Sequence, residues 1–77
     1  MEVTLENIYC RVTVSASSQA DLAAQLAKQN AAVEQAQLQF DKEQHSHLRE
    51  TFASQLIREK TILAAMQRLQ VLQTIRT

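Results

Sequence analysis

The polar block Asp41-Lys42-Glu43-Gln44-His45-Ser46-His47 separates two stretches in which apolar residues recur with helical spacing. Asp41 can cap a new helix, and Gln44 three residues later completes a capping-box pattern, which predicts a turn at this point. The chain contains no glycine and no proline, so one continuous helix from Ser17 to Arg76 is the competing architecture. Because the block interrupts the heptad spacing at mid-length, we favour a helical hairpin.

The stretch before the block predicts a helix over residues 18–40. Ser18 and Asp21 form a capping-box pattern, and the alanine-rich run that follows has high helix propensity. Large side chains line one narrow stripe at spacings near those of a heptad: Leu22, Leu26, Val33 and Phe40. The opposite side carries an alanine stripe that would let another helix approach closely: Ala20, Ala24, Ala27, Ala31 and Leu38.

The stretch after the block predicts a second helix over residues 46–75, following a turn near 41–46. Its apolar side chains project within about 140° of one another. We expect a hairpin seam in which the first stripe meets Leu48, Phe52, Leu56, Leu63, Met66 and Leu69. Other apolar residues point to a different side of this helix and are expected to face a partner: Ile57, Val71, Leu72 and Ile75.

Residues 1–16 form a separate N-terminal apolar segment. Between Val3 and Val14, apolar residues largely alternate with polar ones and many are β-branched, which is typical of a strand. A lone strand leaves its backbone groups unpaired, and several of the same residues also fit a helical face, so a short helix stays open. The sequence therefore predicts an all-α fold: an antiparallel, coiled-coil-like hairpin over residues 17–77, preceded by a strand or short helix.

Composition argues against several classes of function. Without glycine the chain has no phosphate-binding loop and no nucleophile elbow, so we expect neither an enzyme nor a bound cofactor. Eight basic residues balance eight acidic ones, which speaks against nucleic-acid binding and membrane-surface helices. The longest apolar run, Ile62 to Met66, is too short to span a bilayer, and the N-terminus is acidic rather than basic like a signal peptide.

Two kinds of side chain with metal or nucleophile chemistry occur outside the apolar stripes. His45 and His47 lie two residues apart and would project about 200° from each other on a helix, so we expect no metal site. Cys10 is the single cysteine and cannot form an internal disulfide; among its apolar neighbours it is interpreted as a small buried residue. The lack of disulfides favours a cytoplasmic location.

A partner is expected from the number of apolar faces. A chain of 77 residues has a small core, and two helices that touch along one seam leave the remaining apolar residues in water. Docking on another helical protein would cover them. A homodimeric coiled-coil adaptor or regulator, in which residues 3–14 pair across the dimer, would also do so.

Three features between Leu22 and Leu63, or slightly beyond, resemble a known family. They are Gln25-Leu26 on the first helix, the hinge Phe40-Asp41-Lys42-Glu43-Gln44-His45, and a second helix ending in the apolar run Ile62 to Met66. The chain resembles the small helical-hairpin co-chaperones of bacterial type III secretion, whose hinge has an apolar residue before an Asp-Pro-Gln-Gln-Tyr type turn. Here Lys42 stands where some relatives have proline, and the N-terminal segment differs from the family's short helix.

The resemblance implies a non-enzymatic role in a bacterial virulence system. In the family, the hairpin packs against the first helices of a larger tetratricopeptide-like chaperone and stabilises it. Together the two proteins cover the self-polymerising helix of the needle subunit in the cytoplasm. Shielding an aggregation-prone amphipathic helix requires apolar surface and no catalytic chemistry, in agreement with the stripes described above.

Overall fold

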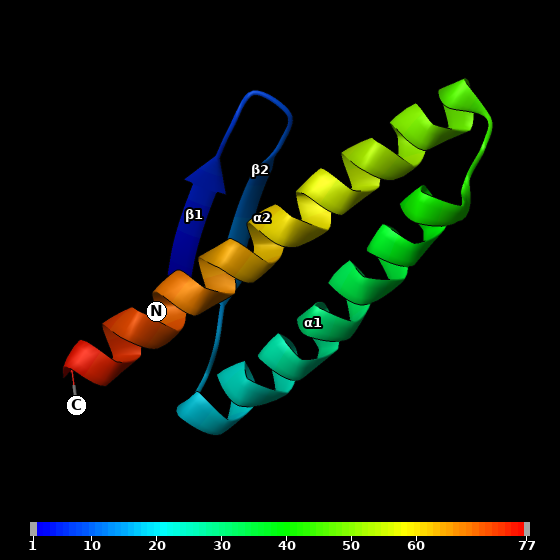
Figure 1. Cartoon of the computed structure of the whole chain (residues 1–77). Coiled ribbons are helices and arrows are strands. Elements are labelled where there is room, and N and C mark those ends of the chain that lie inside the picture. The colour runs from blue at the N-terminus through cyan, green and yellow to red at the C-terminus, as the bar shows by residue number, and fades with distance from the viewer. Residues whose placement is uncertain (1, 77) are drawn as a thin grey trace.

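The structure, a computed structural model, describes residues 2–76. Strands β1 (Glu2–Glu6) and β2 (Arg11–Ser15) are followed by helices α1 (Gln19–Lys42) and α2 (Ser46–Arg76). Figure 1 shows a β-hairpin beside a helical hairpin whose two arms run in opposite directions. The helical hairpin is confirmed and the continuous helix is excluded. Of the two alternatives for the N-terminal segment, the strand is the one observed, as part of a two-stranded antiparallel sheet, so the chain is mostly rather than entirely helical.

The two strands supply each other's backbone hydrogen bonds, which removes the objection to a strand in this segment. Val3 lies opposite Val14 and Leu5 opposite Val12. Val3, Val12 and Val14 are buried, whereas the alternate positions face solvent. On that solvent face Thr4 Oγ1 and Thr13 Oγ1 share a hydrogen bond of 2.9 Å. The alternation seen in the sequence is therefore real, but it belongs to two short strands rather than to one.

Asn7 makes the turn between the strands. Its Oδ1 accepts hydrogen bonds from the backbone N–H of Tyr9 at 2.8 Å and of Cys10 at 2.9 Å, the arrangement of an Asx turn. Its Nδ2 donates to Thr61 Oγ1 of α2 at 3.1 Å. One side chain thus closes the β-hairpin and also attaches its loop to the second helix.

The start of α1 carries the expected cap in a shifted form. Ser18 Oγ accepts from the backbone N–H of Asp21 at 3.1 Å. In the usual capping box the Asp21 side chain would accept a hydrogen bond from the backbone N–H of the N-cap residue, Ser18. Here the Asp21 carboxylate accepts instead from the backbone N–H of the preceding residue, Ser17, at 3.0 Å. Gln25 Nε2 donates both to Asp21 Oδ2 and to the backbone carbonyl of Ser15. These bonds connect the end of β2 to the first turns of α1.

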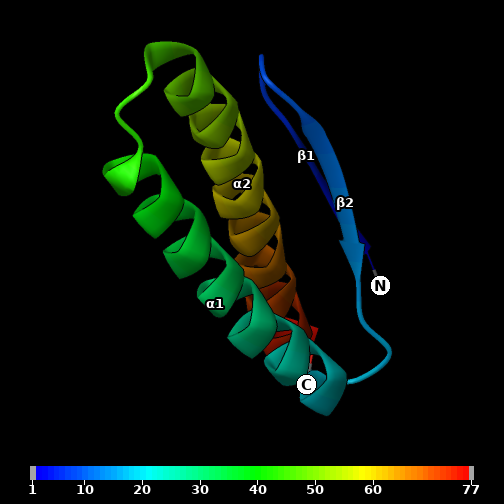
Figure 2. The same ribbon diagram turned by 90° about the vertical axis from the view of Figure 1, so that its right-hand side faces the viewer.

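Helix α2 is the central element of the fold. It packs against α1 and also against both strands, and Figure 2 shows it between α1 and the β-hairpin. Leu22 of α1 and Leu69 of α2 are fully buried, and Ala65 has no exposed surface. These residues and Met66 join the three buried valines of the sheet in one core. The β-hairpin therefore covers the C-terminal half of α2.

Candidate functional site

The residues selected for the hairpin seam lie at different depths. Four of them are buried: Leu22, Leu56, Met66 and Leu69. Five are half-buried: Leu26, Val33, Phe40, Phe52 and Leu63. Leu48, at the end of the seam beside the turn, is 39% exposed. In the same region the Arg49 guanidinium stacks 4.5 Å from the centroid of the Phe40 ring.

Two further positions of the α1 stripe, Gln29 and Ala36, are buried. Gln29 is 9% exposed, and its Nε2 donates to Glu59 Oε2 at 2.6 Å and to the Glu59 backbone carbonyl at 2.9 Å. Ala36, two turns farther along α1, is 3% exposed. Both residues occupy heptad-like positions between the large side chains of the stripe, but nothing in the sequence identifies Glu59 as the partner of Gln29.

The histidines lie at the turn between the helices. The His45 and His47 rings are 6.3 Å apart in an edge-to-face arrangement, and His45 Nδ1 lies 2.9 Å from Glu43 Oε1. The backbone N–H of His45, followed by its side chain, lowers the pKa of Glu43. Among residues 2–76, no three His, Cys, Asp or Glu side chains come together as metal ligands would. The cluster stabilises the turn geometry, because Glu43 also accepts from the N–H of Gln44.

Cys10 is half-buried and packs against the core rather than inside it. Its neighbours at the tip of the β-hairpin are far more exposed: Ile8 is 91% exposed and Tyr9 is 66% exposed. Sequence reasoning did not single out this tip. Its signal was Asn7, a residue typical of turns that interrupts the apolar alternation.

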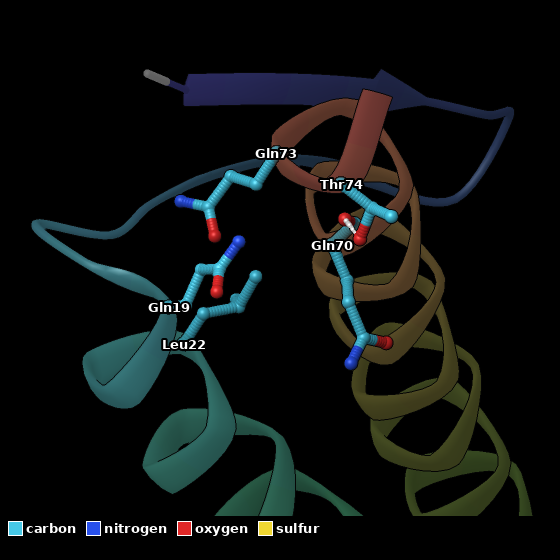
Figure 3. A pocket seen from close by; sticks show the side chains of 5 residues that line it. All are labelled: Gln19, Leu22, Gln70, Gln73 and Thr74. Atoms are coloured by element: carbon cyan, nitrogen blue, oxygen red, sulfur yellow. Dashed lines mark hydrogen bonds between the residues drawn. The ribbon is translucent and has the colours of Figure 1, made fainter. Parts of the chain in front are cut away.

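A small cavity of about 130 Å³ lies where the beginning of α1 is next to the end of α2. Figure 3 shows its lining, which comes from the first turn of α1 and the last turns of α2: Gln19, Leu22, Gln70, Gln73 and Thr74. Thr74 Oγ1 donates to the backbone carbonyl of Gln70 at 2.9 Å. The lining contains three amides, one hydroxyl and one leucine, and none of these five side chains is ionisable near neutral pH.

The residues expected to face a partner lie mainly on the outside of α2. Ile75 is 74% exposed, Val71 is 57% exposed and Leu72 is 38% exposed, while Ile57 is half-buried. At about 100° per residue, Val71 and Ile75 share one face with Ile57, whereas Leu72 lies roughly a quarter turn toward the β-hairpin. We call the shared face the outer stripe; it comprises Ala53, Ile57, Ala64, Val71 and Ile75.

Helix α1 also keeps apolar surface in water. Every member of its alanine stripe is exposed in the structure: Ala20, Ala24, Ala27, Ala31 and Leu38. Leu38 borders an open hollow that it shares with Val33, Glu34 and Gln37. Among residues 2–76, most of the exposed apolar side chains lie at the β-hairpin tip, on the back of α1 and on the outer stripe, while Leu48 lies beside the turn and Leu72 next to the outer stripe.

Neither described helix has the length and apolar character needed to cross a lipid bilayer. Comparison with known proteins found no match to a protein-family model, to a curated protein sequence or to a solved structure.

Proposed function

We propose that this chain is a non-enzymatic protein-binding module that covers a helical partner. In its most specific form, it is a cytoplasmic co-chaperone that stabilises a larger tetratricopeptide-like chaperone and helps to keep a type III secretion needle subunit from polymerising. The observation that carries the proposal is the outer stripe. Val71 and Ile75 stay in water although the chain has assembled a core with fully buried leucines.

The energetic argument concerns what the isolated chain leaves uncovered. Burying an exposed valine or isoleucine side chain contributes about 1.5–3 kcal/mol. Val71 and Ile75 lie one turn apart on the same face, and the strongly exposed Ile8 lies at the β-hairpin tip. Exposed apolar side chains that lie together on one face, as Val71 and Ile75 do, usually mark a contact with another protein.

The co-chaperone form rests on the resemblance over residues 22–63 together with the helical hairpin itself. A hinge at residues 43–45 joins two helices, as the resemblance implies. A long helix with an apolar outer face offers the surface on which another amphipathic helix can lie. The β-hairpin is the point at which this chain differs from the family's short N-terminal helix.

Co-expression with a tetratricopeptide-like chaperone and a needle subunit from the same organism tests the proposal. We expect a soluble complex, and we expect purified chain to delay needle polymerisation as measured by light scattering. Val71→Glu should abolish co-purification, and charge reversal at Leu72 (Leu72→Glu) should weaken it. Asn30→Glu adds the same charge at an exposed position of α1, away from the outer stripe, and serves as the matched control.

A complex that survives both Val71→Glu and Ile75→Glu would contradict the proposal, as would a chaperone that is equally soluble without this chain. A homodimeric adaptor is the second candidate, favoured by the outer edges of β1 and β2, which pair with no further strand among residues 2–76. Sedimentation of the isolated chain as a tight dimer with a sharp melting transition would support that candidate.

A further inference from the structure

The outer stripe extends along most of α2. Its five residues are separated by four, seven, seven and four positions, which keeps them on one side of the helix. The stripe extends over roughly 33 Å at 1.5 Å per residue. Ala64, at its centre, is small and exposed, so the backbone of another helix can approach closely there.

The charges beside the stripe have one sign. Lys60 and Arg68 are exposed and flank Ala64 on opposite sides. Residues 53–75 contain a single acid, Glu59, which lies on the α1 side of the helix, where its carboxylate accepts the hydrogen bond from Gln29. Within residues 2–76, neither Lys60 nor Arg68 forms an ion pair with a carboxylate. The acids of β1, Glu2 and Glu6, are on the exposed positions of the sheet.

This charge distribution discriminates between two occupants. A second copy lying antiparallel and centred on Ala64 would match Ile57 with Val71, but it would gather two lysines and two arginines around the contact with no acid to compensate them. A helix with the same apolar spacing and acidic flanks would pair with both basic side chains. Charge complementarity therefore disfavours self-association through this face.

Building on the proposed protein-binding function, we propose that the outer stripe binds an amphipathic helix whose apolar seam is flanked by glutamate or aspartate. The apolar seam supplies burial along α2. Lys60 and Arg68 select the partner by charge and fix its position across the stripe.

Two synthetic helical peptides with an identical leucine and alanine seam test the proposal, one flanked by glutamates and the other by lysines. A hydrocarbon staple on the far face holds both peptides helical, and fluorescence anisotropy measures their binding to the full chain. We expect the glutamate peptide to bind at least about tenfold more tightly than the lysine peptide, with a preference that decreases as salt is added.

Charge-reversal variants assign the preference to the two flanking bases. Lys60→Glu with Arg68→Glu should reverse the preference. Lys28→Glu with Lys42→Glu makes the same change in net charge at exposed positions of α1 and should leave the preference intact. Circular dichroism checks that both variants stay helical, and Val71→Asp should weaken binding of the glutamate peptide.

Several outcomes would overturn the proposal: no binding of either peptide, equal binding of both, or a preference that survives the change at Lys60 and Arg68. A chain that sediments as a dimer and becomes monomeric on Val71→Asp would also overturn it, because a second copy would then occupy the stripe. If the co-expressed complex forms and keeps its affinity in the Lys60 and Arg68 variant, the protein-binding function stands and only the acidic-helix assignment fails.

Discussion

Gln29 of α1 makes two hydrogen bonds to Glu59 of α2 across the helix seam. The Gln29 amide donates to the Glu59 side chain at 2.6 Å and to its backbone carbonyl at 2.9 Å. The contact lies between the apolar packing of Leu22 with Leu69 at one end of the seam and the buried Ala36 and Leu56 toward the other. A polar pair at a single level of an apolar seam favours one register of the two helices, because a slip would leave the buried Gln29 amide without its partner.

Replacement of Gln29 by alanine should destabilise the fold. The change leaves the Glu59 carboxylate without its donor at a partly buried position, and we expect the free energy of unfolding to fall by about 1–3 kcal/mol. Urea denaturation followed by circular dichroism measures the loss. Gln35→Ala, an exposed position on the same helix, is the control and should change stability by less than about 0.5 kcal/mol. Equal effects of the two substitutions would contradict the assigned role of the pair.

Asn7 offers a test that separates its two contacts. Asn7→Ala removes both the acceptor for Tyr9 and Cys10 and the donor to Thr61, and should lower the free energy of unfolding by about 1–2 kcal/mol. Asn7→Asp retains the acceptor that closes the turn but loses the amide donor, so its loss should be smaller. Amide hydrogen exchange at Tyr9 and Cys10 reports the turn directly. Faster exchange in the alanine variant only is the expected result; equal exchange in both variants would show that the turn does not depend on the Asn7 acceptor.

Substitution by leucine should have different effects on stability at Ala65 and at its neighbour Ala64. Ala65 has no exposed surface and belongs to the core beneath the β-hairpin, whereas Ala64 is exposed. Ala65→Leu should force the β-hairpin away from α2 and lower the free energy of unfolding by about 1–3 kcal/mol. Ala64→Leu should change stability by less than about 0.5 kcal/mol. Thermal unfolding of the two variants decides the point, and a neutral Ala65→Leu would mean that the hairpin does not pack on α2 as described.

Asp21 predicts an acid-sensitive contribution to stability. The backbone N–H of Ser17 is the main group that lowers the pKa of Asp21 below its usual value of 3.8. Because the pKa is lower in the folded state, the contribution is complete above the usual value and is lost as the pH falls through the folded-state pKa. The difference in unfolding free energy between the natural chain and Asp21→Asn should therefore shrink on acidification from about pH 6 to pH 2.

Urea titrations at several pH values between these limits measure the difference for Asp21→Asn. Glu34→Gln removes an exposed carboxylate from the same helix and controls for the change in net charge. A difference for Asp21→Asn that stays constant across the range would show that the cap does not depend on the charge of this carboxylate.

The helices and their connection follow from local signals. Ser18 and Asp21 mark the start of α1, and the polar residues after Phe40 mark the turn, because capping and hydrophobic spacing act over a few neighbouring residues. The depth of the seam residues did not follow in the same way. Leu48 and Leu56 fit the same apolar face, yet Leu56 is buried and Leu48 is exposed, because burial depends on the neighbouring elements that pack over each position and not on spacing along the helix alone.

The sequence by itself determined two long helices, the break between them and an apolar outer face on the second, since these depend on propensity and periodicity along the chain. Only the tertiary structure decided that residues 2–15 fold as two paired strands, that Asn7 docks on Thr61, and that Gln29 meets Glu59. The last two contacts join residues 54 and 30 positions apart. The strands are stable as a pair because each satisfies the other's backbone, and as a layer because α2 provides the apolar surface that a two-stranded sheet lacks on its own.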